Sequence, residues 1–256
     1  MNKKEKTLIP ERLAKLRDIA RERRVVRVDE LCVELGVSRP TVRRDLVQLE
    51  KSGVLRRVHG GAISMETNLE EPLFDDKTSM ATREKRQIAE VAADLVAPGE
   101  TIYLDGGSTL LELARILRIR TDIRIVTNSL RTTIELSGSG PQVTLIGGKL
   151  RRRSQTMVGA LTQPILEKLH FDAAFMGTIG LTIKDGLTTT DPDEAFTKQL
   201  AMRRSDRVIL LVDSSKIGKV SFARAGTIKN ISVLVTDKKT NKKFLTDINK
   251  MGIATL

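Results

Sequence analysis

From about residue 100 onward, short runs of apolar residues alternate with stretches in which apolar residues recur at helical spacing. The apolar runs predict buried strands at Thr101–Leu104, Ile123–Thr127, Val143–Ile146, Ala173–Met176, Val208–Val212 and Ser232–Val235. The helical spacing predicts helices near Thr109–Leu117, Leu130–Leu136, Val158–Leu169, Glu194–Arg203 and Asn241–Asn249. Continuously apolar strands are buried on both faces, so this alternation predicts an open, mainly parallel α/β sheet with helices on each side.

Residues 37–50 predict a helix with one narrow apolar stripe and a basic face. Ser38 is a favourable N-cap, and Pro40 is tolerated in the first turn, where backbone N–H groups have no intrahelical partner. On a helical wheel, Leu46 and Leu49 fall within about 40° of Val42. The other side of the helix holds Pro40, Thr41, Arg43, Arg44, Gln48 and Lys51. Such a helix packs on a small core and leaves its basic residues exposed.

The segment before this helix predicts a partner helix that ends at a glycine. Asp29 can cap this partner helix, and Gly36 can adopt the positive φ that ends it. Its apolar side consists of Leu31, Cys32 and Leu35. A further helix, from Pro10 to about Glu22, packs on the pair. Two helices joined by a glycine turn form the helix-turn-helix pattern, in which the second helix reaches base edges and Arg pairs with guanine.

Residues 53–62 predict a short hairpin beside the second helix. Val54, Leu55 and Val58 supply its apolar positions, and Gly60-Gly61 supplies its turn. Val25, Val26 and Val28 form a short extended piece that can join this hairpin. A hairpin with two arginines next to a recognition helix is typical of a winged helix-turn-helix domain, which places such residues on phosphates or in a minor groove.

Two blocks of this region resemble the DeoR family of bacterial sugar-metabolism regulators. The first is the segment 37–46, which contains the letters RRDL, and the second is 57–62, which contains HGGA. A basic solvated helix in an unrelated domain is the simpler alternative, but it would not bring the cap, turn and hairpin with it. The predicted DNA-binding residues are Ser38, Arg39, Pro40, Thr41, Arg43, Arg44, Gln48, Arg56, Arg57 and His59.

The positive charge is concentrated in the N-terminal quarter of the chain. The net charge is +12, and residues 1–62 hold 16 Lys and Arg against 9 Asp and Glu, which suits a segment that binds a polyanion. The single cysteine, Cys32, excludes an intramolecular disulfide and suits a reducing compartment. No apolar run is long enough to cross a membrane, and the basic N-terminus has no apolar region behind it. We therefore expect a cytoplasmic protein.

These patterns predict three parts in the 256 residues. A winged helix-turn-helix DNA-binding domain spans residues 8–63, and an α/β domain spans residues 77–256; the resemblance to the DeoR family implies that this second domain senses an effector. Residues 64–76 have no clear period and are acidic, so we expect a linker there.

Five predicted strands end in small or polar residues, and ligands of parallel sheets bind beyond the carboxyl ends of the strands. The five ends are Asp105-Gly106-Gly107-Ser108-Thr109, Thr127-Asn128-Ser129, Gly147-Gly148, Gly177-Thr178 and Asp213-Ser214-Ser215-Lys216. Glycines before a helix N-terminus suit an anion, because free N–H groups and the helix dipole favour negative charge. Lys216 can add a positive charge for a phosphate, and Asp105 and Asp213 can accept from sugar hydroxyls.

Each of these features alone has an equally good simple explanation: a glycine turn can be an ordinary turn, a hydroxyl residue can be a helix cap, and a lysine can be a surface side chain. The hypothesis of a ligand site therefore depends on the convergence of these features at one edge of the sheet. The first turn lacks the G-x-G-x-x-G spacing, which disfavours a dinucleotide site. We predict no cofactor and no metal.

The strand ends also resemble the DeoR-type sensor domain, which extends the resemblance to nearly the whole chain. The matching pieces are 105–109, 127–130, Gly147-Gly148, Phe171-Asp172, Glu194-Ala195 and 213–216. That domain is similar to sugar-phosphate isomerases and coenzyme A transferases, and the resemblance implies a phosphorylated sugar or related metabolite as effector. Ala173 stands where a lysine is often found, and Met176-Gly177-Thr178 differs from the commoner Ile-Gly pair. The predicted effector-binding residues are Asp105, Gly106, Gly107, Ser108, Thr109, Thr127, Asn128, Gly147, Gly148, Glu194, Asp213 and Lys216.

We therefore expect a repressor of a sugar or polyol catabolic operon that leaves its operator when the effector binds. Its expected partners are double-stranded operator DNA, a phosphorylated sugar or polyol, and further copies of the chain in a dimer or tetramer, with no membrane. The alternative is a sugar-phosphate isomerase or transferase-like enzyme on the same fold, with Asp105, Asp213, Glu194 and Lys216 as acids and bases. Such an enzyme has no use for a helix-turn-helix, and a non-specific architectural DNA binder has no need of a sensor-sized domain.

Overall fold

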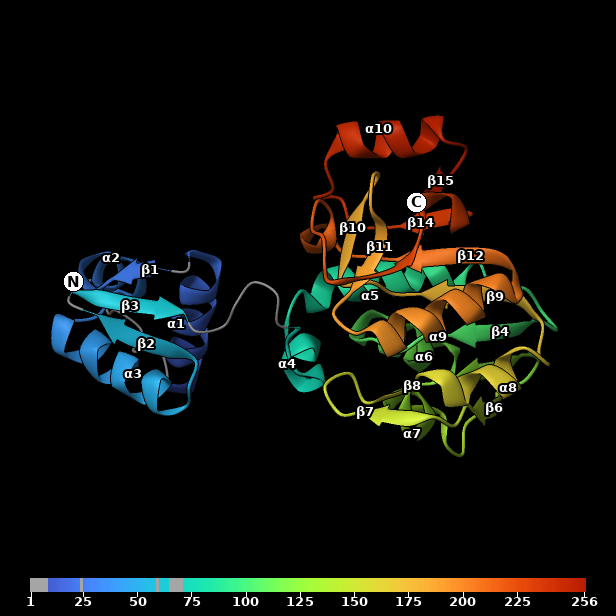
Figure 1. Ribbon diagram of the computed structural model, residues 1–256, viewed down its shortest axis with the longest axis horizontal. Coiled ribbons are helices and arrows are strands. Elements are labelled where there is room, and N and C mark those ends of the chain that lie inside the picture. Colours follow the sequence, from blue (N-terminus) through green and yellow to red (C-terminus); the bar gives the residue numbers. More distant parts are fainter. Residues whose placement is uncertain (1–8, 24, 59, 65–70) are drawn as a thin grey trace. The chain divides into compact units, whose positions relative to one another are not determined.

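A computed structural model describes residues 9–23, 25–58, 60–64 and 71–256 (Figure 1). The chain divides into two units, which we call unit 1 (residues 1–70) and unit 2 (residues 71–256). The predicted linker therefore includes residues that belong to unit 2. Glu71 is buried there, and Phe74, almost fully buried, begins helix α4 (Phe74–Ser79). No helix in the described part of the chain is both long enough and apolar enough to cross a membrane.

Unit 1 combines three helices with a small antiparallel sheet. Its elements are α1 (Ile9–Arg23), β1 (Val25–Arg27), α2 (Val28–Leu35), α3 (Arg39–Lys51), β2 (Leu55–Val58) and β3 (Gly61–Ser64). The hairpin strands β2 and β3 pair with each other, and β1 pairs with β3, so the upstream extended piece joins the hairpin as predicted. The stripe of Val42, Leu46 and Leu49 is buried in a core that all three helices share. Unit 1 is a winged helix-turn-helix domain.

The turn of this motif confirms one cap prediction and corrects two. Gly36 ends α2 with a φ of 65°, as expected. The N-cap of α2 is Arg27, however, and Asp29 lies in the first turn, where it forms an ion pair with Arg39. Ser38 does occupy the N-cap position of α3, but its hydroxyl lies 3.0 Å from the Thr41 hydroxyl and makes no hydrogen bond to the backbone.

Unit 2 is built on a seven-stranded sheet in which every neighbouring pair is parallel. The strands, in sheet order, are β15 (Ala254–Thr255), β14 (Val233–Val235), β12 (Ser205–Leu211), β9 (Phe171–Met176), β4 (Thr101–Leu104), β5 (Arg124–Thr127) and β6 (Gln142–Leu145). Six of them occupy the predicted runs to within a few residues. The mainly parallel α/β prediction is confirmed.

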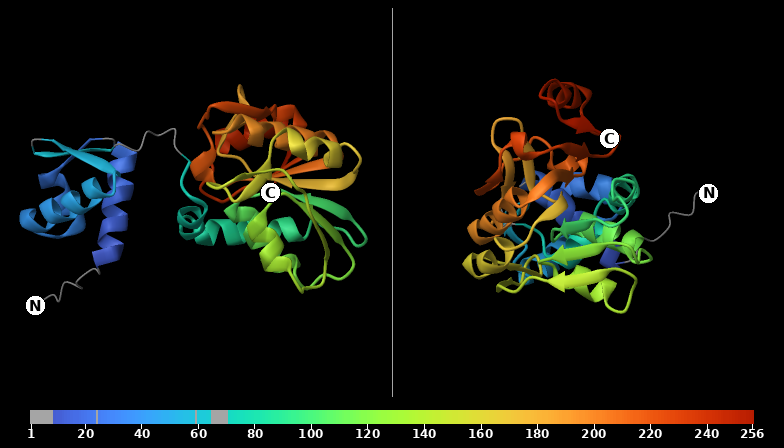
Figure 2. Two further views of the ribbon diagram at one scale, coloured as in Figure 1. Left: turned by 60° about the horizontal axis from the view of Figure 1, so that its bottom comes forward. Right: turned by 90° about the vertical axis from the view of Figure 1, so that its right-hand side faces the viewer.

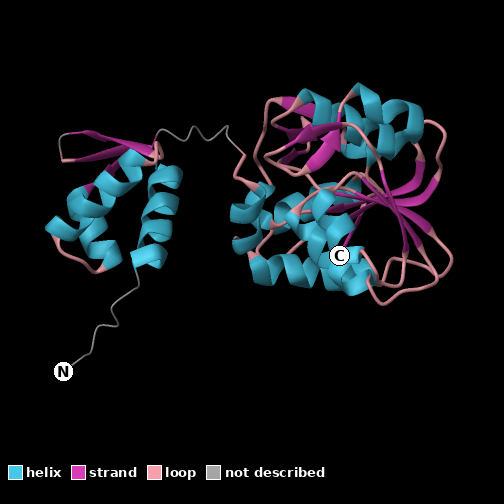
Figure 3. Cartoon of the chain, turned by 90° about the horizontal axis from the view of Figure 1, so that it is seen from below, coloured by secondary structure: helices cyan, strands magenta, loops and turns pink. Residues whose placement is uncertain are grey.

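Helices cover both faces of this sheet, as Figures 2 and 3 show. One apolar cluster joins the sheet to α5 (Thr82–Ala93), α6 (Ser108–Leu117) and α7 (Leu130–Leu136). The other joins it to α8 (Gln163–Leu166), α9 (Pro192–Arg203) and α10 (Lys242–Lys250). Along β4, Ile102 and Leu104 belong to the first cluster and Tyr103 to the second. This two-sided burial explains why the strands are apolar without interruption.

The predicted helix at 158–169 is correct only in its middle part. The segment begins with the end of strand β8 (Thr156–Val158), continues as a short 3-10 helix (Ala160–Thr162) and becomes α-helical in α8, which ends at Leu166. Gly159 interrupts it with a φ of 88°, and the Gly159 N–H donates to the Thr197 hydroxyl of α9. β8 instead pairs with β7 (Lys149–Arg151) in a hairpin.

Unit 2 also contains a small antiparallel sheet, in which β11 (Gly186–Thr189) lies between β10 (Gly180–Thr182) and β13 (Ala223–Gly226). These strands are too short, and too rich in Gly and Thr, to produce a recognisable periodicity.

Candidate functional site

The outer side of α3 and the hairpin carry most of the predicted DNA contacts. Ser38, Arg39, Pro40, Arg43, Arg44 and Gln48 are exposed, and Thr41 is half-buried. Within the described residues, neither Arg43 nor Arg44 forms an ion pair, whereas Arg39 lies 2.8 Å from the exposed carboxylate of Asp29. Arg43 and Arg44 are therefore the more available cations of this surface.

The hairpin is attached to the C-terminal part of α3. Arg56 and Arg57 of β2 are both exposed. The backbone N–H of Arg57 donates to the Glu50 carboxylate at 2.8 Å, and the guanidinium lies 4.0 Å from the same carboxylate. This contact fixes the hairpin beside the recognition helix. His59, the remaining predicted contact, lies outside the described residues.

A partly buried ion pair, which no sequence pattern indicated, holds α3 against α1. Asp45 is almost fully buried and accepts from two nitrogens of Arg12, at 2.6 and 3.1 Å. The hydrogen bond to Asp45 raises the pKa of Arg12 above its usual value. Because Asp45 lies between exposed Arg44 and buried Leu46, it orients the helix without facing the DNA-binding side.

One cavity of unit 2 has a volume of about 180 Å³ and lies beyond the carboxyl ends of β4, β9 and β12. Seven of the predicted effector residues line it: Gly106, Gly107, Ser108, Thr109, Glu194, Asp213 and Lys216. An eighth, Asp105, is buried behind the wall, where it forms an ion pair with the lining residue Lys198. Three of the five predicted strand ends thus converge on one cavity.

The other four predicted residues, at the ends of β5 and β6, are not among the lining residues. Thr127 donates to the carbonyl oxygen of Leu104 at 2.6 Å, and the Asn128 side chain donates to Met157 at 3.0 Å. The hairpin β7–β8 covers this end of the sheet, because the Met157 N–H donates to the carbonyl of Asn128. Gly147 and Gly148 lead into this hairpin, where Gly148 packs closely against Thr162 and Val158.

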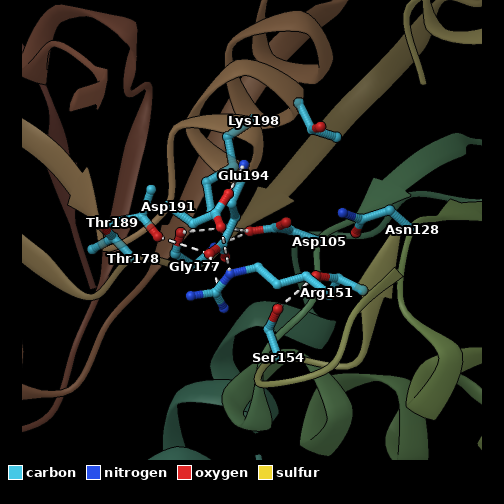
Figure 4. Close-up of polar contacts among 12 residues, drawn as sticks. Asp105, Asn128, Arg151, Ser154, Gly177, Thr178, Thr189, Asp191, Glu194 and Lys198 are labelled. Carbon is cyan, nitrogen blue, oxygen red and sulfur yellow. Dashed lines mark hydrogen bonds and ion pairs between the residues drawn. The ribbon is translucent and has the colours of Figure 1, made fainter. Parts of the chain in front are cut away.

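The cavity floor contains buried charges of both signs (Figure 4). Lys198 is fully buried and forms ion pairs with Asp105 and, at 3.5 Å, with Glu194. Its ammonium also donates to the carbonyl of Gly177 at 3.1 Å, and the Gly177 N–H donates to Asp105 at 3.0 Å. Burial lowers the pKa of Lys198, but the Asp105 and Glu194 carboxylates outweigh burial and raise it. Lys198 is therefore a permanent cation.

A second group of charges surrounds Glu71. Its carboxylate lies 2.5 Å from the Lys77 ammonium and 2.7 Å from the Arg151 guanidinium. Arg151 also contacts Asp191 at 3.2 Å and Glu194 at 3.5 Å, which joins this group to the cavity floor. Burial alone raises the pKa of Glu71, but the charges of Lys77 and Arg151 lower it to about 2. Glu71 is therefore ionised at neutral pH.

Lys85 supplies a cation of a different kind. Its ammonium is buried in the cavity wall and donates to the carbonyls of Lys77 and, at 2.6 Å, Met80. The Lys77 carbonyl belongs to the last turn of α4 and the Met80 carbonyl to the link between α4 and α5, in which Ala81 adopts a φ of 49°. Burial lowers the pKa of Lys85 to about 8, with the Asp213 carboxylate opposing the shift. Lys85 shares the buried face of α5 with Ile88, Ala89 and Ala92, and this spacing was the signal that could have revealed it.

In the described part of the chain, no cluster of His, Cys, Asp and Glu side chains is arranged to hold a metal ion. Asp213 acts as the cap of a short turn, since its carboxylate accepts from the N–H of Ser215 at 3.0 Å and from the hydroxyl of the same residue. What the cavity offers a ligand is a set of buried cations, a helix N-terminus and ionised carboxylates.

Comparison with known proteins gives matches over most of the chain. The model of the DeoR-like helix-turn-helix domain matches residues 12–68, and that of the DeoR C terminal sensor domain matches residues 80–238. The chain is 36% identical over 226 residues to the HTH-type transcriptional regulator GlpR of Haloferax volcanii, covering 88% of this chain and 89% of that protein. It is 37% identical over 237 residues to the lactose phosphotransferase system repressor of Streptococcus mutans, covering 91% and 94%.

Among solved structures, ribose 5-phosphate isomerase A from Methanocaldococcus jannaschii is similar, with a TM-score of 0.39 and 20% identity, over 52% of this chain and 53% of that one.

Proposed function

Since the chain belongs to the DeoR family of transcriptional regulators, we propose that it represses a sugar or polyol catabolic operon and leaves its operator when a phosphorylated sugar or related metabolite binds. It is a DNA-binding regulator, and the alternative of an isomerase or transferase-like enzyme is not favoured. Operator binding belongs to residues 8–63, and effector binding to residues 77–256 together with Glu71.

On the DNA side, Arg43 and Arg44 contact the operator in the major groove. Their exposure, and the absence of ion pairs to them among the described residues, support this assignment. One arginine can read a base while the other holds a phosphate, and only the base contact discriminates between sequences. Arg56 and Arg57 contact the DNA backbone from the hairpin.

On the effector side, the N-terminus of α6 and two lysines bind the phosphate. The first N–H groups of this ten-residue helix have no intrahelical partner, and the N-cap residue, Gly107, has no side chain to occupy them. Lys85 and Lys216 line the same cavity and add charge. Glu194 also lines the cavity, and its carboxylate can accept from a sugar hydroxyl. This combination of an open helix N-terminus with buried Lys85 and half-buried Lys216 is the observation that supports a phosphorylated ligand.

The test is release of the protein from its operator. Footprinting on DNA next to the neighbouring genes gives the operator, and fluorescence anisotropy then measures its affinity with fructose 1-phosphate, fructose 6-phosphate or glycerol 3-phosphate present. We expect at least one phosphate ester to weaken operator binding by roughly 5–150-fold, and its unphosphorylated counterpart to act far more weakly. Equal effects of the two would contradict the assignment of the phosphate site.

The active form is a dimer or larger even assembly. One recognition helix reads few base pairs, and a two-fold assembly doubles the site, with half-sites about 10 base pairs apart or a multiple of that. Light scattering together with footprinting tests this, and a monomer that protects one unrepeated site would contradict it.

A further inference from the structure

Glu71 is the first residue of unit 2, directly after residues 65–70, and it is also part of the effector cavity wall. Only 2% of its surface is exposed. Besides its ion pairs with Lys77 and Arg151, its carboxylate accepts from the Thr190 hydroxyl at 2.9 Å. A residue at the start of a domain is rarely buried with three polar partners. Glu71 therefore anchors the start of unit 2.

The anchor includes the main chain around Glu71. The guanidinium of Arg153 donates to the Glu71 carbonyl oxygen, and the Phe74 N–H donates to the Arg153 carbonyl at 3.0 Å. Residues 71–74 are thereby attached to the segment that follows β7, whose Arg151 holds the Glu71 carboxylate. Loss of the contacts of the Glu71 carboxylate would therefore weaken the attachment of residues 71–74 as a whole.

The cations that hold Glu71 lie beside the ligand site. Lys77 lines the cavity together with Glu71, and Lys85 donates to the Lys77 carbonyl. Since Glu71 is ionised at neutral pH, an anionic ligand in this small cavity faces a like charge. The ligand and Glu71 therefore compete for the same positive charge.

We propose that Glu71 couples the effector cavity to the operator-binding unit: a bound phosphate ester weakens the ion pairs of Glu71 and releases the start of unit 2, whereas the anchored state favours operator binding. This inference rests on the proposed function. A ligand shifts such an equilibrium only through unequal affinity for the two states, and the repulsion by Glu71 supplies that inequality.

The test is the variant Glu71→Gln in the full chain. The phosphate ester with the largest effect on the wild type among fructose 1-phosphate, fructose 6-phosphate and glycerol 3-phosphate serves as the probe. We expect the ligand-free variant to bind operator as weakly as the ligand-saturated wild type does. We expect the probe to bind the variant about five- to tenfold more tightly, because the repelling charge is gone. The ratio of probe dissociation constants with and without operator should fall from roughly 5–150 to below about 2.

The matched control is Asp75→Asn, in the same segment. Asp75 forms an exposed ion pair with Arg131 at 2.5 Å and does not line the cavity. The operator affinity, the probe affinity and the ratio of probe dissociation constants should therefore keep their wild-type values. A second variant, Thr190→Val, removes one hydrogen bond of Glu71 and leaves every charge in place. Thr190→Val should shift the operator affinity, the probe affinity and the ratio in the same direction as Glu71→Gln, by about twofold each. This variant provides the test if Glu71→Gln does not fold.

The outcomes separate this inference from the proposed function. A wild type that responds to no phosphate ester overturns both. A responsive wild type with an equally responsive Glu71→Gln overturns the coupling role alone. Weaker probe binding with an unchanged ratio also overturns it, because that result assigns Glu71 to a purely structural role or to a direct ligand contact.

Discussion

Effector affinity is expected to fall as the pH rises from 7 to 9, because Lys85 loses its charge in this interval. Burial lowers the pKa of Lys85 to about 8, below the value of an exposed lysine. The second ionisation of a phosphate monoester lies near pH 6, so the ligand keeps a constant charge above pH 7. A change of affinity between pH 7 and 9 therefore reports on the protein.

The size of the effect follows from the titration of one group. If the phosphate binds only the charged form of Lys85, the apparent dissociation constant scales as 1 + 10^(pH − pKa). With a pKa of about 8, this factor rises about tenfold between pH 7 and pH 9, which corresponds to about 1.4 kcal/mol of binding free energy.

Isothermal titration calorimetry at constant ionic strength measures this dependence directly, with the same phosphate ester at each pH. The variant Lys85→Arg is the control, because a guanidinium stays charged throughout this range. Its affinity at pH 7 can differ from that of the wild type, but its pH profile should be flat. A flat wild-type profile, or an equal slope in both proteins, would refute the assignment of Lys85 to the phosphate.

Three further outcomes are expected. Arg44→Ala should weaken operator binding at least about tenfold at physiological salt, measured by anisotropy, while Arg83→Ala in unit 2 should not. Asp45→Ala should destabilise unit 1 by about 1–3 kcal/mol in thermal or denaturant unfolding, because it removes the charge-assisted hydrogen bonds between half-buried Arg12 and buried Asp45. Lys216→Ala should keep operator affinity and lose the effector response; a normal response would remove Lys216 from the site.

The hydrophobic pattern was sufficient to predict the main sheet and the recognition helix. Val42, Leu46 and Leu49 are buried as the helical wheel requires, and β4 occupies the predicted run, Thr101–Leu104. Both predictions depend on burial of apolar side chains over an uninterrupted element, where a regular period is visible in the sequence. The segment 158–169 has apolar residues at helical spacing too, but Gly159 at a positive φ separates strand β8 from a short helical stretch that ends at Leu166.

The buried charges of the cavity were the main omission. The sequence offered no reason to select Lys85, Lys198, Arg151 and Glu71. Charged side chains are normally exposed, and only an ion-pair or hydrogen-bond partner offsets the cost of burying them. Those partners are distant in sequence: Lys198 pairs with Asp105, and Arg151 with Glu71. Only the helical positions gave a local signal, since Lys198 shares a buried face of α9 with Glu194 and Ala201.

The hairpin β7–β8 explains both why four predicted residues do not line the cavity and why other residues of the site were not predicted. It covers the ends of β5 and β6 through the hydrogen bond from Met157 to Asn128, so the cavity is confined to the ends of β4, β9 and β12. The same hairpin supplies Arg151, whose guanidinium contacts Glu71, Asp191 and Glu194 together. One structural element therefore limits the size of the cavity and also holds two carboxylates of its wall. Without that guanidinium, Glu71 would depend on Lys77, and Glu194 on Lys198, which also pairs with Asp105.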